Sequence, residues 1–322
     1  MNEKISKILY SIRLYVRLIE FLKNIRFRGD KISLYFILKT FLEKLMKNEI
    51  LERANMVAFS FSVAIFPAIL FLFTLIPYIH NFIPEVDNAS IMKFIGSMMP
   101  ESMFTVIEAT TFEIISKSRG DLLTFGFFLS LFLATNGTMA LITAFNSRYK
   151  MEHCRTYFQN RLIAVGLTFM LAFVLIAAIV LLVAGQLLVD YLVESSPIDV
   201  DNLTVYALLL LRFVVLFIVF WIAISCLFYF GSEVHQNWKF FSYGSFFATI
   251  LSLMASYLFS YYIANFGTYN KLYGSIGVML AFMIWVWILA VILLVCYELN
   301  TSIHQSIQLT KDKRNHPMLE SL

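Results

Sequence analysis

The chain has 322 residues, of which 60% are hydrophobic and only 14% are charged, and its mean hydropathy is +0.77. Soluble domains average about 25% charged and 45–50% apolar residues, so this composition excludes a water-soluble globular protein. The formal net charge of +4 is modest, and its distribution along the chain is more informative than its sum. The expected fold class is all-α, that of a polytopic membrane protein.

Residues 1–53 are basic, with twelve Lys/Arg against six Asp/Glu. Apolar residues recur at helical spacing from Ile5 to Leu22 and again from Ile32 to Met46. Basic amphipathic helices that are too short to cross a bilayer lie on its surface, so membrane lipids are the expected partners. Nucleic-acid binding is the alternative, but it is not expected because inserted proteins ordinarily have basic cytoplasmic flanks.

Six apolar runs follow, each long enough for a helix to cross the roughly 30 Å hydrocarbon core. We expect transmembrane helices at about 54–76, 122–145, 162–189, 205–230, 240–266 and 276–297. Between the first two spans, the segment from Pro84 to Asp121 has the pattern of two short amphipathic helices broken at Pro100. It carries six acidic residues, so we place this helix pair at the outer surface. The tail, 301–322, is polar and short.

The charges of the connecting segments predict the orientation. Six spans place alternate connections on opposite sides of the membrane. One side, which includes both termini, carries 20 Lys/Arg, and the other side carries 4. Cytoplasmic loops are enriched in Lys and Arg, so we expect residues 1–53 and the tail to be cytoplasmic.

Three blocks of sequence resemble a known family. They are Arg53-Ala54 with AFSFSVAIFP ending at Pro67, the run from Ala144 to Tyr149 (AFNSRY), and NFGTYNKLYGSIG with YELN at 265–300. On these blocks the chain resembles the YihY/virulence factor BrkB family of bacterial inner-membrane proteins. It departs from the family pattern where an Ala-Tyr pair is usual, because it has Ala58-Phe59.

The resemblance implies a six-span, all-helical protein of the bacterial inner membrane and leaves the activity open. It also singles out motif residues with a structural role: Asn146, Arg148, Tyr273, Gly274, Gly277, Glu298 and Asn300. Some members of the family are labelled ribonucleases. This sequence does not favour that activity, because a zinc-dependent nuclease needs clustered His and Asp ligands and the five histidines are scattered singly.

Arg212 is the only charged residue inside a predicted span. A charge at mid-bilayer costs at least about 2.5–3.5 kcal/mol and usually faces a bundle interior or a cavity. Arg212 lies about 10–12 Å below the outer end of its span. It therefore either extends to the surface to meet Asp190 or Glu194, or contacts an anionic substrate.

The fifth span carries small residues at every fourth position: Gly244, Ala248, Ser252, Ser256 and Ser260. Such a stripe indicates close helix–helix packing. The functional alternative is that Ser252, Ser256 and Ser260 line a path for a solute.

Three further features have both a structural and a functional interpretation. Pro67 in the first span, and Asn136 with Thr138 in the second, mark either simple kinks or broken helices of the kind that bind substrates in transporters. Tyr273-Gly274-Ser275 forms either a helix cap, with Ser275 as the capping residue, or a set of backbone donors for an anion.

Glu298 and Asn300 lie at the cytoplasmic end of the last span. A carboxylate at a helix C-terminus is unfavourable beside the helix dipole, so we expect a cationic partner, Arg53 or Arg148.

These features favour a transporter or translocase for an anionic solute or lipid. The alternative is a membrane scaffold or assembly partner in envelope maintenance that transports nothing. An enzyme is not expected, because the sequence contains no Ser/His/Asp set, no HExxH motif and no paired intramembrane aspartates. The three cysteines have no ligand spacing, so no metal and no cofactor are expected.

Overall fold

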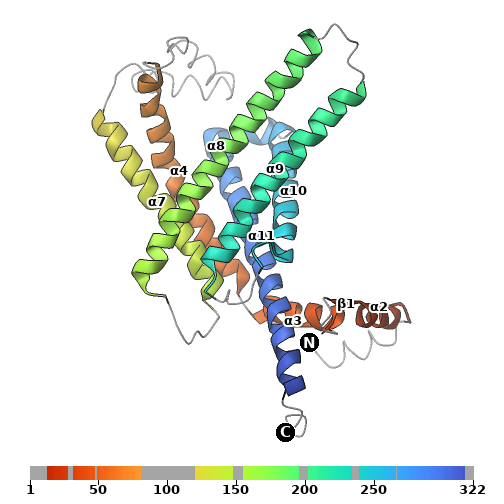
Figure 1. The fold of residues 1–322 in the computed structure, drawn as a ribbon. Coiled ribbons are helices and arrows are strands. Elements are labelled where there is room, and N and C mark those ends of the chain that lie inside the picture. The colour runs from red at the N-terminus through yellow and green to blue at the C-terminus, as the bar shows by residue number, and fades with distance from the viewer. Residues whose placement is uncertain are drawn as a thin grey trace.

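A computed structural model of the chain describes residues 13–27, 32–47, 49–80, 120–147, 155–195, 202–233, 239–265 and 267–315. Each predicted span corresponds to one long helix, and the fifth helix is slightly shorter than its predicted span (Figure 1). These helices are α4 (Ile50–His80), α7 (Gly120–Asn146), α8 (Tyr157–Ser195), α9 (Asn202–Gly231), α10 (Tyr243–Asn265) and α11 (Gly267–Asn315). All six contain a stretch long and apolar enough to cross a membrane, which confirms the predicted all-α class and the number and order of the spans.

The N-terminal region folds beside one end of the six-helix bundle. It consists of α2 (Arg13–Asn24), α3 (Leu34–Lys47) and a two-stranded antiparallel ladder between them, β1 (Arg26–Phe27) and β2 (Ile32–Ser33). α3 lies crosswise to the bundle and packs against α11 (Figure 1). Ile19 of α2 and Ile37 of α3 are buried, so the apolar faces predicted for the membrane surface are used at least in part within the protein.

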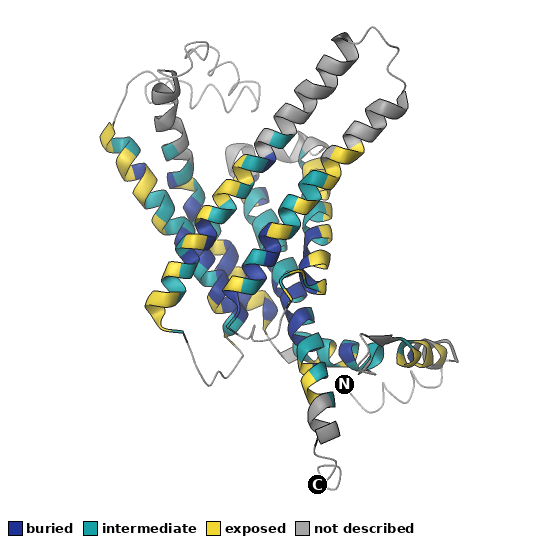
Figure 2. Cartoon of the chain, viewed as in Figure 1, coloured by how far each residue is buried: buried dark blue, intermediate teal, exposed yellow. Residues whose placement is uncertain are grey.

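The buried residues gather toward the end of the bundle beside α3, which we call the basic end (Figure 2). Phe145 of α7 stacks on Tyr297 of α11 with a centroid distance of 4.3 Å. Phe228 of α9 meets both rings edge-on, at 5.5 and 5.7 Å. Each of these three rings is less than 2% exposed, and together they form an aromatic centre that joins three helices.

Small residues allow the helices to approach one another closely at two crossings. A Cβ at Gly137 of α7 would lie 2.8 Å from the ring of Phe61 in α4. A Cβ at Gly244 of α10 would collide with the backbone carbonyl of Cys296 in α11. Close packing of this kind is a main source of helix association in a bilayer, where lipid is as apolar as the side chains.

The predicted helix cap is wrong, and so is the broken-helix alternative for Asn136 with Thr138 and for Pro67. α11 begins at Gly267 and runs unbroken through Tyr273, Gly274 and Ser275, so no helix cap or exposed set of backbone donors forms there. α7 continues through Asn136 and Thr138 in the same way, and α4 through Pro67, so neither is a broken helix. An unpaired backbone group costs several kcal/mol in lipid, and a continuous helix avoids this cost.

The last helix is longer than its predicted span, because α11 continues through the polar tail from 301 to Asn315. The predicted outer helix pair within 84–121 lies almost entirely outside the described residues, as does Arg148.

Candidate functional site

A buried ion pair connects the first and last membrane helices at the basic end. Nη2 of Arg53 in α4 lies 2.8 Å from Oε1 of Glu298 in α11, and the two side chains are 9% and 0% exposed. Nη1 of Arg53 also donates to the carbonyl of Ala144 in α7, at 2.6 Å. Glu298 thus has the cationic partner expected for it. These contacts join α4, α7 and α11 in the buried interior, where a charge without a partner would cost the most free energy.

A lysine from α3 completes this basic-end cluster, which consists of Lys44, Arg53, Glu298 and Thr301. Nζ of Lys44 donates to the hydroxyl of Thr301 at 3.0 Å, and that hydroxyl lies 3.1 Å from Oε2 of Glu298. Burial lowers the pKa of Lys44 from 10.5 to about 8, although the charge of Glu298 acts in the opposite direction. The cluster fixes α3 to the end of the bundle.

Asn146, a motif residue, connects the ends of α7 and α9. Its Nδ2 donates to the carbonyl of Gly231 at 2.8 Å, and its Oδ1 accepts from the backbone N–H of Glu233 at 2.9 Å. The carboxylate of Glu233 in turn accepts a hydrogen bond from Asn160 of α8, at 3.0 Å. A single amide therefore satisfies backbone groups of the connection that follows α9.

Asn300 acts in a similar way at the start of α10. Its Nδ2 donates to the hydroxyl of Ser242 at 2.7 Å, and its Oδ1 accepts from the backbone N–H of Gly244 at 2.8 Å. Ser242 also accepts from the backbone N–H of Ser245, as an N-capping residue does. The sequence does not predict the contact of Ser242 with Asn300, because the two residues are far apart in the chain and Asn300 belongs to another helix, α11.

The stripe of small residues on α10 changes character along the helix. Gly244 and Ala248 are buried and pack closely, as in the structural interpretation, whereas Ser252 and Ser256 are half-buried and Ser260 is exposed. Ser256 and Ser260 line a pocket of about 460 Å³ between α10 and α11. Ser256 and Ser260 are therefore placed as the functional interpretation, a path for a solute, requires. Ser252 does not line the pocket.

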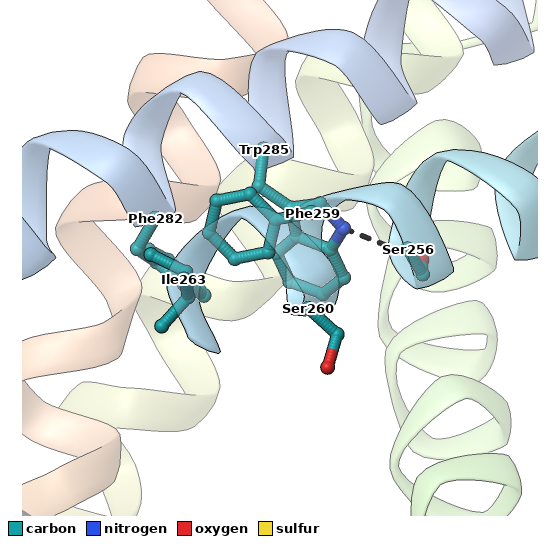
Figure 3. A pocket seen from close by; sticks show the side chains of 6 residues that line it. All are labelled: Ser256, Phe259, Ser260, Ile263, Phe282 and Trp285. Atoms are coloured by element: carbon teal, nitrogen blue, oxygen red, sulfur yellow. Dashed lines mark hydrogen bonds between the residues drawn. The ribbon is translucent and has the colours of Figure 1, made fainter. Parts of the chain in front are cut away.

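Half of the residues that line this α10–α11 pocket are aromatic (Figure 3). The ring of Trp285 stacks on Phe259 at 5.7 Å, and its Nε1 donates to the hydroxyl of Ser256 at 3.3 Å. Ile263 and Phe282 complete the lining. The arrangement offers an apolar surface with two hydroxyl groups, which suits an amphiphilic molecule better than a hydrated ion.

Asn136 and Thr138 both bond to α8, in separate contacts. The hydroxyls of Thr138 and Thr168 lie 2.9 Å apart and are buried between the helices. Oδ1 of Asn136 accepts from Nη1 of Arg161 at 2.5 Å, and the Arg161 guanidinium lies 5.0 Å from the centroid of the Phe132 ring. In the sequence, Arg161 is only one of the basic charges beside the third span, and no signal there points to its contact with Asn136.

The remaining candidates lie in helices. Arg212 belongs to α9, but its side chain is not among those described. Pro67 and Gly277 are buried in α4 and α11. In the described part of the chain, no group of three or more His, Cys, Asp and Glu side chains is placed to hold a metal ion.

Comparison with known proteins agrees with this architecture. The family model of virulence factor BrkB matches residues 41–320. The chain belongs to the virulence factor BrkB family. A relative in the same comparison, the putative ribonuclease-like protein YfkH of Bacillus subtilis (strain 168), is 26% identical over 279 residues, which cover 87% of this chain and 99% of the relative. No solved structure matches.

The match to the BrkB family contains every polar contact described above, from Lys44 to Thr301, and leaves out α2. With six helices able to cross a bilayer, this BrkB-family chain is a multi-pass membrane protein. Its motif residues Asn146, Glu298 and Asn300 join helix ends at the basic end. They have a structural role there, and the pocket and the Arg161 contact are the candidate sites that this structural role does not explain.

Proposed function

We propose that this protein is a translocase for an anionic lipid in the bacterial inner membrane, with both termini in the cytoplasm. The α10–α11 pocket is the observation that carries the proposal. It lies between two membrane helices and combines stacked aromatic rings with the hydroxyls of Ser256 and Ser260. With the basic end in the cytoplasm, the pocket belongs to the outer half of the bilayer.

The surface around the pocket supports a lipid rather than a small hydrated anion. Tyr257, Leu258 and Tyr261, on the same stretch of α10, are all more than 50% exposed. In a membrane such side chains face lipid, so a ligand reaches the pocket from the bilayer. The acyl chains of such a ligand stay in the bilayer, which is as apolar as the pocket wall, so the two hydroxyls select the polar part of the molecule.

The test is lipid movement in vesicles that contain the purified protein. Fluorescent phosphatidylglycerol is placed in both leaflets, and its loss of fluorescence to an external reductant measures the exchange between leaflets. Ser260→Leu fills the pocket from an exposed position and is expected to slow exchange. Tyr257→Phe, which changes an exposed hydroxyl on the same helix, is the matched control and is expected to leave exchange unchanged. Equal rates for Ser260→Leu and the wild type would contradict the assignment of the pocket.

A non-transporting scaffold is the second candidate. The helical extension of α11 beyond 300 favours it, because the extension projects from the bundle beside α3 and offers a surface to a cytoplasmic partner (Figure 1). Co-purification of a stoichiometric partner, together with the absence of lipid exchange in vesicles, would support the scaffold over the translocase.

Ribonuclease activity is not part of the proposal. The name of the Bacillus subtilis relative describes that protein, and this chain has its five histidines at widely separated positions. Metal-dependent RNA cleavage by the purified protein, abolished by replacement of one of these histidines, would reverse this part of the proposal.

A further inference from the structure

Arg161 is a cation without an acidic partner in the part of the chain that the structure describes. Its Nη1 donates to Asn136, and its guanidinium lies over the Phe132 ring. No ion pair joins it to any described Asp or Glu. Nδ2 of Asn136 likewise has no acceptor among the described residues. Two groups of hydrogen-bond donors therefore meet between α7 and α8 with no carboxylate from the described residues paired to them.

The depth of these two donors in the bilayer determines how costly the lack of an anionic acceptor is. Arg161 lies in the second turn of α8, and Asn136 lies about 15 Å along α7 from the end of that helix at Asn146. Asn136 lies inside the apolar part of α7, where an amide donor without an acceptor is costly, and a ligand that brings acceptor oxygens removes this cost. A phosphate group has such oxygens and the geometry to accept from a guanidinium.

The surroundings of the site indicate where the phosphate comes from. Phe132, Phe158 and Leu162 are all more than half exposed and lie on the same stretches of α7 and α8 as the two donors. These side chains face acyl chains in a membrane, so the donors are reached from the lipid phase. The positive charge and the apolar surface together match a phospholipid.

We propose that Arg161 and Asn136 form a binding site for the phosphate of an anionic phospholipid in the leaflet at the basic end. The site draws the phosphate inward from the headgroup region, because Asn136 lies deeper than Arg161. This inference deepens the proposed function, on which the role of the site in transport rests. The binding itself is tested independently of transport.

The experiment is native mass spectrometry of the purified full-length protein released from a bilayer of equal parts phosphatidylglycerol and phosphatidylethanolamine. The wild type is expected to retain phosphatidylglycerol in preference. Arg161→Gln is expected to reduce this preference at least about tenfold, since a hydrogen bond to a charged group is lost. Arg155→Gln is the matched control, because Arg155 lies near the same helix end and donates to the carbonyl of Phe230 instead. It is expected to retain the preference.

Asn136→Asp separates lipid binding from a purely structural role. The new carboxylate provides Arg161 with an internal anion, so the protein is expected to remain folded while the lipid preference falls as in Arg161→Gln. A structural hydrogen bond alone would leave the preference of Asn136→Asp unchanged. That result would overturn the proposal, as would an equal loss of preference in Arg155→Gln.

Inorganic phosphate distinguishes the two sources of the anion. Added at millimolar concentration, it is expected to leave the bound phosphatidylglycerol in place. Displacement of the lipid by inorganic phosphate would assign the site to a soluble anion and overturn the lipid proposal. A wild type that retains phosphatidylglycerol but exchanges no lipid between leaflets would refute the translocase and leave this binding site standing.

Discussion

Glu298 is the residue on which the basic end depends most. It is fully buried, and its carboxylate interacts with Arg53 and Thr301. Glu298→Gln leaves the Arg53 guanidinium buried without a counter-charge, and removal of one partner of a buried pair costs about 3–5 kcal/mol. We expect a lower unfolding temperature in detergent.

The neighbour of Arg53 provides the control for this prediction. Glu52 is exposed on the same helix, and Glu52→Gln is expected to change stability by no more than about 0.5 kcal/mol. If the two Glu→Gln variants unfold at the same temperature, the ion pair contributes nothing measurable to stability.

Lys44 makes the stability of the basic end depend on pH. Burial lowers the pKa of Lys44 from 10.5 to about 8, so between these values the unfolded chain binds more protons than the folded protein. The penalty for burying the charged amine is present in full below pH 8 and is relieved as the pH rises toward 10.5. Lys44→Met removes this penalty, so its gain in unfolding temperature over the wild type is expected to shrink across this range. A difference that does not vary with pH would contradict this assignment, and Lys39→Met, on the exposed face of α3, is the control.

The sequence predicted some of these residue contacts and missed others for a physical reason. The sequence predicted a cationic partner for Glu298, but the reason given, a carboxylate at a helix C-terminus, is wrong because α11 continues to Asn315. Glu298 needs the cation because its carboxylate is fully buried. The pairing of Arg161 with Asn136 depends on the rotation and crossing of α7 and α8, which hydropathy does not determine. Arg161 also lies at the end of a span, where basic residues are expected without any specific partner.

At the scale of single helices, the packing of α10 on α11 depends on one missing side chain. A Cβ at Gly244 would collide with the carbonyl oxygen of Cys296 and with the Asn300 side chain that caps α10. A backbone oxygen cannot turn aside as a side chain can, so Gly244→Ala forces the helices apart. We expect a clear loss of thermal stability.

Gly166 of α8 is the matched position, because a Cβ there has no atom within 4 Å. Alanine is favoured over glycine in a helix interior by up to about 1 kcal/mol, so Gly166→Ala is expected to be neutral or stabilising. Equal destabilisation by the two Gly→Ala changes would show that the close approach at Gly244 is not what matters.

The helix ends were predicted less well than the helices themselves. The apolar runs marked all six spans, but α8 begins at Tyr157 and α11 extends to Asn315, beyond the apolar part in both cases. Hydropathy reports the part of a helix that lies in lipid, whereas a helix also continues where polar contacts support it. For α11 the contact with α3 and the Lys44–Thr301 bond provide this support.

At the scale of the whole molecule, the distribution of charge predicts the orientation. A cysteine introduced into the acidic connection 190–204, as Ser196→Cys, is expected to react with a membrane-impermeant maleimide on intact cells. The chain carrying it has Cys154, Cys226 and Cys296 replaced by alanine. Asn237→Cys, in the connection after α9, is expected to react only after the membrane is permeabilised. The reverse pattern would invert the assignment of the basic end to the cytoplasm.

The translocase proposal is tested most directly by comparing two fluxes through the purified wild-type protein in vesicles. Exchange of fluorescent phosphatidylglycerol between leaflets is measured beside the efflux of a trapped soluble anion. We expect the protein to accelerate the lipid exchange well above protein-free vesicles while the trapped anion remains inside. Lipid exchange at the protein-free rate, in vesicles where the protein is folded and inserted, would contradict the proposal.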